Sequence, residues 1–338
     1  MKFKESSIPF EKEIKEKEEL INKEFKTIFG VQEDAPEARP VPDAEKILYG
    51  DRQPDGIFLL EVGERVFGYE TYQPTNEANG VWLVTEHGHC GQARDWAKLA
   101  KLANEKGFGL LSLDMHRKGK NMYEKMSMKI DQWMAVAQQA PAIFQKHNIS
   151  PKKLIFLGQS SGGSAGAALA TEGREKHPYD GVILIGPTLT TVDPEALKVM
   201  DKVIDQHLGS DEDIMIDWKW LAPLIKQFKD ENLNKAYAGY LSTLPGFPYR
   251  HSRDSMTIDD SRILEKLNKV DIPMIITRGE FDQVDHQSLN KAQEILKKEH
   301  NPNITFGTIK GAGHQAHIEN PKLVMNSIEQ LLAETETD

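Results

Sequence analysis

One stretch of the sequence limits the possible folds more than any other, an apolar segment that runs into a serine flanked by glycines. Residues 154–163 read Leu-Ile-Phe-Leu-Gly-Gln-Ser-Ser-Gly-Gly, and alanine and glycine are frequent among the residues that follow. A serine on a tight turn between a strand and a helix is held in a strained conformation, with its Oγ exposed at the carboxyl end of the strand. Such a turn closes only around small neighbours, and Gly158 and Gly162 stand on either side of Ser160. Ser160 is therefore the candidate nucleophile.

The same glycines exclude the neighbouring serine as the nucleophile. Ser161 would need a glycine at position 159, where the sequence has Gln159. The helix that begins here directs N–H groups and the positive end of its dipole toward the turn. We therefore expect the N–H of Ser161 to face an oxyanion that forms on a substrate attacked by Ser160.

Length, charge and cysteine content exclude several classes of protein. The 338 residues are enough for one large α/β domain with an insertion, or for two ordinary domains. A net charge of -10 and the lack of a basic cluster interleaved with aromatics argue against nucleic acid as a partner. No apolar run is long enough to span a bilayer. The single cysteine, Cys90, and an amino terminus without an apolar signal segment predict a cytoplasmic protein, and no pattern predicts its oligomeric state.

Residues 1–45 are expected to form a charged, helical amino-terminal extension. Lysine and glutamate are intermixed in residues 11–26, and a linker with three prolines follows at residues 35–42. The pattern fits either a solvated, partly docked extension or a helix that binds a partner. The apolar residues at helical spacings are Ile14, Ile21, Phe25 and Ile28.

The next part of the chain predicts a doubly wound, mostly parallel sheet of the α/β class. Residues 56–62 and 65–72 are typical of an antiparallel hairpin. Strand and helix patterns then alternate, which implies parallel neighbours, right-handed crossovers and helices on both faces. The strands are expected at residues 81–85, 109–113, 153–157 and 182–185, and the helices at 94–106, 131–145 with a bend at Pro141, and 161–174.

The alternation stops at residues 194–262, where no convincing strand pattern is present. Aromatic and leucine residues come there at loosely helical spacings, which predicts a helical insertion. The sheet resumes with strands at residues 273–277 and 304–309 around a helix at 286–298, and a last helix begins at Pro321 with Asn320 as its cap. We therefore expect an α/β core over residues 46–193 and 263–338.

A serine hydroxyl needs a base to take its proton and a third group to hold that base. Doubly wound sheets place such groups on loops at the carboxyl ends of strands. Asp282 and His314 each follow a predicted strand by a few residues, so the chain order is Ser160, Asp282, His314. Asp285 competes for the role of the acid, and His317, which we expect to be a surface or supporting residue, competes for the role of the base.

Four motifs at these positions resemble those of the α/β-hydrolase superfamily. Gly-Gln-Ser-Ser-Gly-Gly at 158–163, Gly-Glu-Phe-Asp at 279–282 and Gly-Ala-Gly-His at 311–314 are similar to its nucleophile, acid and histidine motifs. His-Gly at 87–88, directly after a predicted strand, is similar to its oxyanion loop. The similarity extends from about residue 56 to the carboxyl terminus, interrupted by the insertion.

The resemblance implies a role for each matched residue. Ser160 would attack, His314 would act as base and then as acid, and Asp282 would orient and stabilise the imidazolium. The backbone N–H groups of His89 and Ser161 would bind the oxyanion. The insertion at residues 194–262 would form a helical cap over the pocket. No cofactor is required.

The chain departs from the family pattern at two places, since the nucleophile motif has Gln159 where histidine is frequent and the loop after Asp114 is longer. The family often has Asp-x-Arg-Gly after the strand at 109–113, whereas this chain has two residues more between Asp114 and Gly119. His87, His89 and Cys90 have a spacing at which zinc could bind. A known metal motif would need an aspartate and a histidine at positions 91 and 92, which are glycine and glutamine, so we expect no metal.

A serine nucleophile excludes the branches of the superfamily that use an aspartate, and leaves acyl transfer to water. We expect a carboxylic-ester hydrolase, covering esterase, lipase and lactonase, and an apolar cap favours a small apolar acyl or aromatic ester. The same triad would also serve hydrolysis of a C–C bond, a thioester or an amide. A third possibility is a ligand receptor on this fold without useful turnover.

Overall fold

The computed structural model describes most of the α/β core and part of the insertion. Described are residues 37–63, 65–89, 91–115, 130–173, 176–189, 222–224, 226–244, 261–283 and 286–335, the pairs 215–216 and 247–248, and the isolated residues Glu16, Glu19, Lys23, Lys26 and Lys219. Of the expected amino-terminal helix only Glu16, Glu19, Lys23 and Lys26 are described, each in helical conformation, and Cys90 and Asp285 lie outside the described residues.

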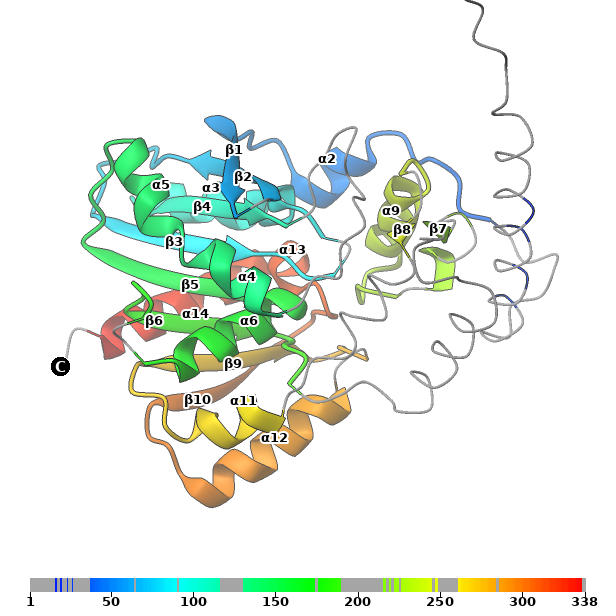
Figure 1. Cartoon of the computed structure of the whole chain (residues 1–338). Helices are drawn as coiled ribbons and strands as arrows, with labels where there is room; N and C mark the ends of the chain where they lie inside the picture. Colours follow the sequence, from blue (N-terminus) through cyan, green and yellow to red (C-terminus); the bar gives the residue numbers. More distant parts are fainter. Residues whose placement is uncertain are drawn as a thin grey trace, which may run out of the picture.

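An eight-stranded sheet forms the centre of the molecule, in the order β1-β2-β4-β3-β5-β6-β9-β10 (Figure 1). β1 pairs with β2, and β2 with β4, in antiparallel fashion, and the remaining neighbours are parallel. The predicted doubly wound, mostly parallel sheet is thus confirmed. Its strands are β1 (Gly56–Val62), β2 (Arg65–Tyr72), β3 (Val81–Glu86), β4 (Gly109–Asp114), β5 (Lys153–Gln159), β6 (Gly181–Ile185), β9 (Met274–Gly279) and β10 (Ile304–Ile309).

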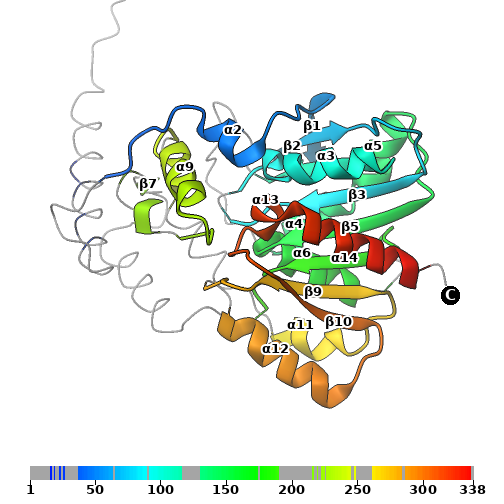
Figure 2. The same ribbon diagram turned by 180° about the vertical axis from the view of Figure 1, so that it is seen from behind.

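Helices cover both faces of the sheet. One face carries α4 (Ile130–Ala137), α5 (Ala140–Lys146), α6 (Ser161–Thr171), α11 (Ser261–Leu267) and α12 (His286–Glu299), which lie in front in Figure 1. The opposite face carries α3 (Ala97–Glu105), α13 (Ala316–Glu319) and α14 (Pro321–Glu334), which lie in front in Figure 2. Successive strand residues point to opposite faces, so Leu83 and Ile155 pack in the α3–α14 core while Val84 and Phe156 pack in the α6 core.

Several helix boundaries differ from those expected. The helix expected at residues 94–106 starts with a 3-10 turn, η1 (Ala93–Trp96), before α3. The helix expected at 131–145 is two helices, because Pro141 lacks an N–H and fits only near the start of α5. The short helices α2 (Ala44–Tyr49), α11 and α13 were not predicted. The proposed boundary at residue 45 falls inside α2, whose Leu48 and Tyr49 are buried in the α3–α14 core.

The described part of the insertion consists of η2 (Ala222–Leu224), α9 (Glu231–Leu241) and the two-residue strands β7 (Met215–Ile216) and β8 (Phe247–Pro248), which pair antiparallel. The expectation that this segment holds no strand is therefore wrong. Asp230 caps α9 by accepting from the second and third N–H groups of the helix, an arrangement worth about 1 kcal/mol. Tyr240 packs edge-on against Tyr49 with ring centroids 6.0 Å apart. The aromatic side of α9 thus extends the α3–α14 core.

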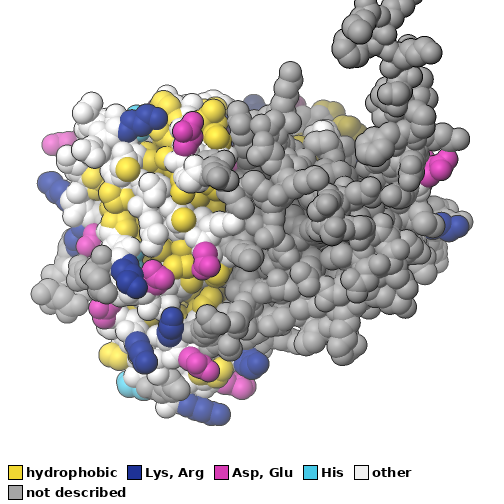
Figure 3. Space-filling view, viewed as in Figure 1, with side chains coloured by type: hydrophobic (Ala, Val, Ile, Leu, Met, Phe, Trp, Pro, Cys, Tyr) yellow, Lys and Arg dark blue, Asp and Glu magenta, His cyan; other side chains and the backbone are white. Residues whose placement is uncertain are grey.

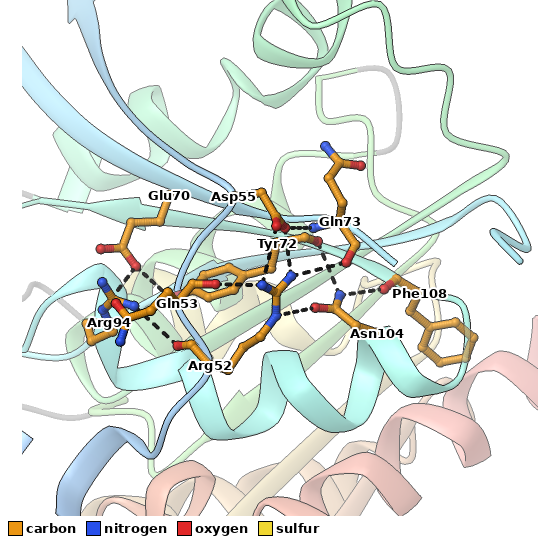
Figure 4. A network of polar contacts seen from close by, with 9 residues as sticks. All are labelled: Arg52, Gln53, Asp55, Glu70, Tyr72, Gln73, Arg94, Asn104 and Phe108. Carbon is orange, nitrogen blue, oxygen red and sulfur yellow. Dashed lines mark hydrogen bonds and ion pairs between the residues drawn. The ribbon is translucent and has the colours of Figure 1, made fainter. Parts of the chain in front are cut away.

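A polar network fastens the antiparallel edge of the sheet to α3 (Figure 4). The guanidinium of Arg52 donates to Asp55 at 2.7 Å and to Asn104 at 3.1 Å. The amide of Asn104 in turn donates to the backbone oxygens of Tyr72 and Phe108, at 3.2 and 2.9 Å. Since these bonds join residues far apart in the chain, they hold the first hairpin on the parallel part of the sheet.

The outer surface of the described core is mixed in character. Figure 3 shows apolar side chains on one face among scattered Lys, Arg, Asp and Glu side chains. Ile57 and Leu59, on the outer side of the edge strand β1, are large apolar residues that remain exposed. Within the described ranges, no helix combines the length and the apolar character needed to cross a membrane.

Candidate active site

Ser160 occupies the turn between β5 and α6 in a strained conformation, with φ 51° and ψ -115°. A positive φ is uncommon for a residue with a side chain and marks stored strain. The turn is held on both sides, because the N–H of Ser160 donates to the oxygen of Ile185 at 3.0 Å and its carbonyl accepts from Ser164 at 2.9 Å. The backbone thus keeps the hydroxyl at the carboxyl end of β5.

The structure gives a steric reason for the glycines around this serine. A Cβ at Gly158 would lie 2.2 Å from the oxygen of Gly162. A Cβ at Gly162 would lie 2.6 Å from the oxygen of His87. Any side chain at either position would push β5, α6 and the end of β3 apart, so glycine is required at this close approach.

Asp282 and His314 meet at the ends of the neighbouring parallel strands β9 and β10. Asp282 Oδ2 lies 3.0 Å from His314 Nδ1, and both side chains are buried. An ionised carboxylate only accepts hydrogen bonds, so the ring proton lies on Nδ1 and Nε2 is the ring nitrogen that carries the lone pair. This tautomer is the one that a general base requires.

The end of β6 places this pair beside the serine turn. A Cβ at Gly186 would lie 2.8 Å from Asp282 Oδ2 and 3.1 Å from His314 Nδ1, so the pair lies directly against the backbone of Gly186. The preceding residue, Ile185, accepts the N–H of Ser160. Ser160, Asp282 and His314 are therefore brought together around one strand end. Asp285, the competing acid, lies outside the described residues.

The turn after β3 runs next to Ser160. A Cβ at Gly88 would lie 2.8 Å from Cβ of Ser160. His87 shapes the turn, because its Nε2 accepts from the N–H of Met115 at 3.0 Å and its Nδ1 donates to the oxygen of Gly88 at 2.7 Å. His89 follows in this turn. The two expected oxyanion donors thus belong to segments that border Ser160 from two sides, since Ser161 is the first residue of α6.

The geometry of His87 leaves no ring nitrogen for a metal. Both nitrogens are engaged by backbone groups, as described above. Among the residues that the structure describes, no group of three or more His, Cys, Asp and Glu side chains is arranged to hold an ion.

His317 is not a surface residue, and this part of the expectation is wrong. It is completely buried in α13, and its ring lies over Trp96 with centroids 4.2 Å apart. Burial, and then the neighbouring imidazoles of His314 and His87, lower its pKa to about 3. Neither ring nitrogen has a hydrogen-bond partner within the described part of the chain. His317 thus lies enclosed beside Trp96, whereas His314 is the imidazole that contacts Asp282.

Two further buried side chains, to which the sequence analysis gave no role at the site, border it. Gln159 is buried, and its Nε2 donates to the backbone oxygen of His314 at 3.4 Å. Glu86 is buried just before the His87 turn, and burial raises the pKa of its carboxyl well above the usual value. The position of Gln159 between a strand end and the serine was a signal for the first, whereas no local pattern marked the second.

The strand order, the strained serine turn and the carboxylate–imidazole pair beyond β9 and β10 define an α/β-hydrolase. Comparison with known sequences places the chain more closely. The family model described as serine aminopeptidase, S33 (Hydrolase_4), matches residues 78–321, more than two thirds of the chain. The chain belongs to this family, and its predicted resemblance to the α/β-hydrolase superfamily is confirmed.

Individual relatives are distant. A 2-succinyl-6-hydroxy-2,4-cyclohexadiene-1-carboxylate synthase of Yersinia pestis bv. Antiqua (strain Nepal516) is 22% identical over 252 residues, which cover 73% of this chain and 86% of the synthase. A thermophilic esterase from Thermogutta terrifontis has a similar structure, with a TM-score of 0.61, 16% identity, and 84% of this chain and 99% of the esterase covered. The enol-lactonase from Burkholderia xenovorans LB400 also gives a TM-score of 0.61, with 16% identity and coverage of 82% and 100%. At these identities the structural likeness shows the fold.

Proposed function

We propose that this hydrolase cleaves carboxylic esters through an acyl-enzyme on Ser160. The observation that carries the proposal is the buried 3.0 Å contact between His314 and Asp282, placed against the strand end that also holds the N–H of Ser160. A nucleophile, an imidazole base and a carboxylate hydrogen-bonded to that base are the parts that acyl transfer requires.

The reaction follows from these positions. His314 Nε2 takes the hydroxyl proton as Ser160 Oγ attacks the ester carbonyl carbon, and Asp282 stabilises the resulting imidazolium. The N–H groups of His89 and Ser161 bind the developing oxyanion, and each such donor contributes about 3–4 kcal/mol in other enzymes. The alcohol leaves with the proton from His314. Water, activated by the same imidazole, then releases the acid and restores the serine.

The proposed substrate class rests on the residues of the insertion and on the names of similar proteins. An apolar acyl or aromatic ester of small size fits an apolar cap formed by residues 194–262. Two proteins with similar folds are named for the hydrolysis of ester bonds, one as an esterase and the other as an enol-lactonase. The family description as serine aminopeptidase favours one alternative, hydrolysis of an amide. A cytoplasmic location and the absence of a nucleic-acid partner stay predictions.

A panel of p-nitrophenyl esters of increasing acyl length, with the matched p-nitroanilides, tests the bond that is cleaved. We expect a higher kcat/KM for the ester of each pair and a preference for one range of acyl length. Faster cleavage of the anilides would assign the chain to amide hydrolysis. Thermal stabilisation by the compounds without any product would favour a receptor.

A further inference from the structure

A short piece of the insertion lies directly on the loop that carries His314. This strap, residues 227–230, connects η2 to α9. The N–H of Gln315 donates to the oxygen of Gln227 at 3.2 Å. A Cβ at Gly313 would lie 2.7 Å from that same oxygen and 2.9 Å from Cα of Phe228. The residues on both sides of His314 therefore contact the strap. A side chain at position 313 would have no room, because the strap backbone lies directly against Gly313.

One carboxylate joins the strap to the loop. Glu319, in α13, accepts the N–H of Lys229 on Oε2 at 3.2 Å and the N–H of Asp230 on Oε1 at 2.7 Å. The same Oε2 accepts the N–H of Gly313, the residue before His314, at 2.6 Å. Hydrogen bonds of this type are shorter and stronger than neutral ones, because the acceptor carries a charge. Two segments 80 or so residues apart in sequence are thus held by one side chain.

The strap is also fixed at its other contacts. The side-chain amide of Asn234, in α9, forms two hydrogen bonds with the backbone of Phe228. Its Oδ1 accepts the N–H at 3.0 Å and its Nδ2 donates to the carbonyl oxygen at 2.8 Å. Lys229 Nζ lies 4.3 Å from the centre of the Phe281 ring, next to Asp282. The strap therefore contacts the loops that carry both members of the carboxylate–imidazole pair.

We propose that Glu319 is a positioning residue that couples the insertion to the base His314. It acts on the backbone at Gly313, one peptide away from His314, and so sets where the imidazole stands relative to Ser160. The inference rests on the proposed function, because it assigns His314 the role of general base. It gives the insertion a second task besides covering the pocket, since the strap completes the support of the base.

The substitution Glu319→Gln tests the coupling with little change in shape. Glutamine has only one acceptor oxygen. This oxygen can accept either the N–H groups of Lys229 and Gly313 or the N–H of Asp230, and the glutamine NH₂ group then faces the remaining N–H donors without accepting from them. We expect kcat for a p-nitrophenyl ester to fall about tenfold with KM within about threefold, because a small misplacement of a catalytic group lowers the chemical step. Glu319→Ala should lower kcat further.

A matched control variant makes the same substitution, glutamate to glutamine, at a position that does not contact the strap. Glu329, on α14, forms a half-exposed ion pair with Lys106 at 2.6 Å. Glu329→Gln should keep the kcat of the parent protein. A purely structural Glu319 would lower the melting temperature in Glu319→Gln and leave the kcat of the folded enzyme unchanged, and this result would overturn the proposal.

A second pair of variants tests the hydrogen bond from the N–H of Asp230 to Glu319. Asp230 has φ -75°, which proline adopts without strain. Asp230→Pro and Asp230→Ala both remove the carboxylate that caps α9, but only proline also removes the N–H that Glu319 accepts. We expect a lower kcat in Asp230→Pro than in Asp230→Ala. Equal kcat values in the two variants would contradict a role for this contact.

Amide hydrogen exchange separates failure of this inference from failure of the proposed function. In Glu319→Gln, the amides of Gly313, Lys229 and Asp230 should exchange faster together, whether or not a substrate is known. Unchanged exchange in an active enzyme overturns the coupling alone. A folded parent protein that neither turns over esters nor reacts with a fluorophosphonate at Ser160 overturns the proposed function, and the role of Glu319 with it.

Discussion

Replacing Gly186 by alanine tests how closely the Asp282–His314 pair is packed. The added Cβ would lie 2.8 Å from Asp282 Oδ2 and 3.1 Å from His314 Nδ1. Unstrained van der Waals contacts begin at about 3.5 Å, so one or both groups must move away by roughly half an ångström. The left-handed φ of 53° at this position adds about 1 kcal/mol of backbone strain for alanine. Since a misplacement of about 1 Å can cost ~100-fold in rate, we expect kcat to fall on the order of tenfold to a hundredfold.

Gly311→Ala supplies the control for this experiment. Gly311 also has a positive φ, 73°, but its added Cβ would meet no atom within 4 Å. Both variants therefore carry similar backbone strain, and only Gly186→Ala carries the steric contact. Ester turnover and thermal unfolding should show a comparable loss of stability in both and a loss of kcat in Gly186→Ala alone. Equal kcat values in the two variants would refute the steric reasoning.

Two further predictions concern the acid and the buried histidine. Asp282→Asn should lower kcat by up to ~10,000-fold, because the amide no longer favours the proton on Nδ1 of His314; a harmless Asp282→Asn beside a damaging Asp285→Asn would move the acid to Asp285. His317→Leu should reduce the acid sensitivity of folding. The folded-state pKa of His317 is lowered from 6.5 to about 3, so the unfolded chain binds the extra proton and stability is lost as the pH falls below 6.5. Urea unfolding should show that the leucine variant gains about 2 kcal/mol relative to the parent between pH 7 and pH 5; a pH-independent difference would contradict the buried, neutral state.

Most of the sheet could be predicted because its strands are short apolar runs bounded by turns. β1, β2 and β10 have the bounds that the sequence indicated, and the central strands differ by one or two residues. The helices were less certain. Pro141 divides α4 from α5, where hydrophobic periodicity alone continued the helix. α2 and α13 span six and four residues, which is too short for a 3.6-residue period to be recognised.

The residues of the candidate site likewise fall into those that the sequence predicted and those that it did not. Ser160 is marked locally, because a strained turn needs small neighbours, and the order of parallel strands brings Asp282 and His314 to one edge of the sheet. Glu319 has no such signal, because it acts on backbone N–H groups of a segment that is distant in sequence. The burial of His317 against Trp96 likewise depends on how α13 packs on η1.

Mass spectrometry of the intact protein after reaction with a fluorophosphonate, followed by peptide mapping, tests the central role of Ser160 most directly. We predict one covalent adduct, located on Ser160, which is lost in Ser160→Ala together with ester turnover while the melting temperature stays the same. A folded parent protein without an adduct, or a Ser160→Ala variant that keeps full turnover, would contradict Ser160 as the nucleophile.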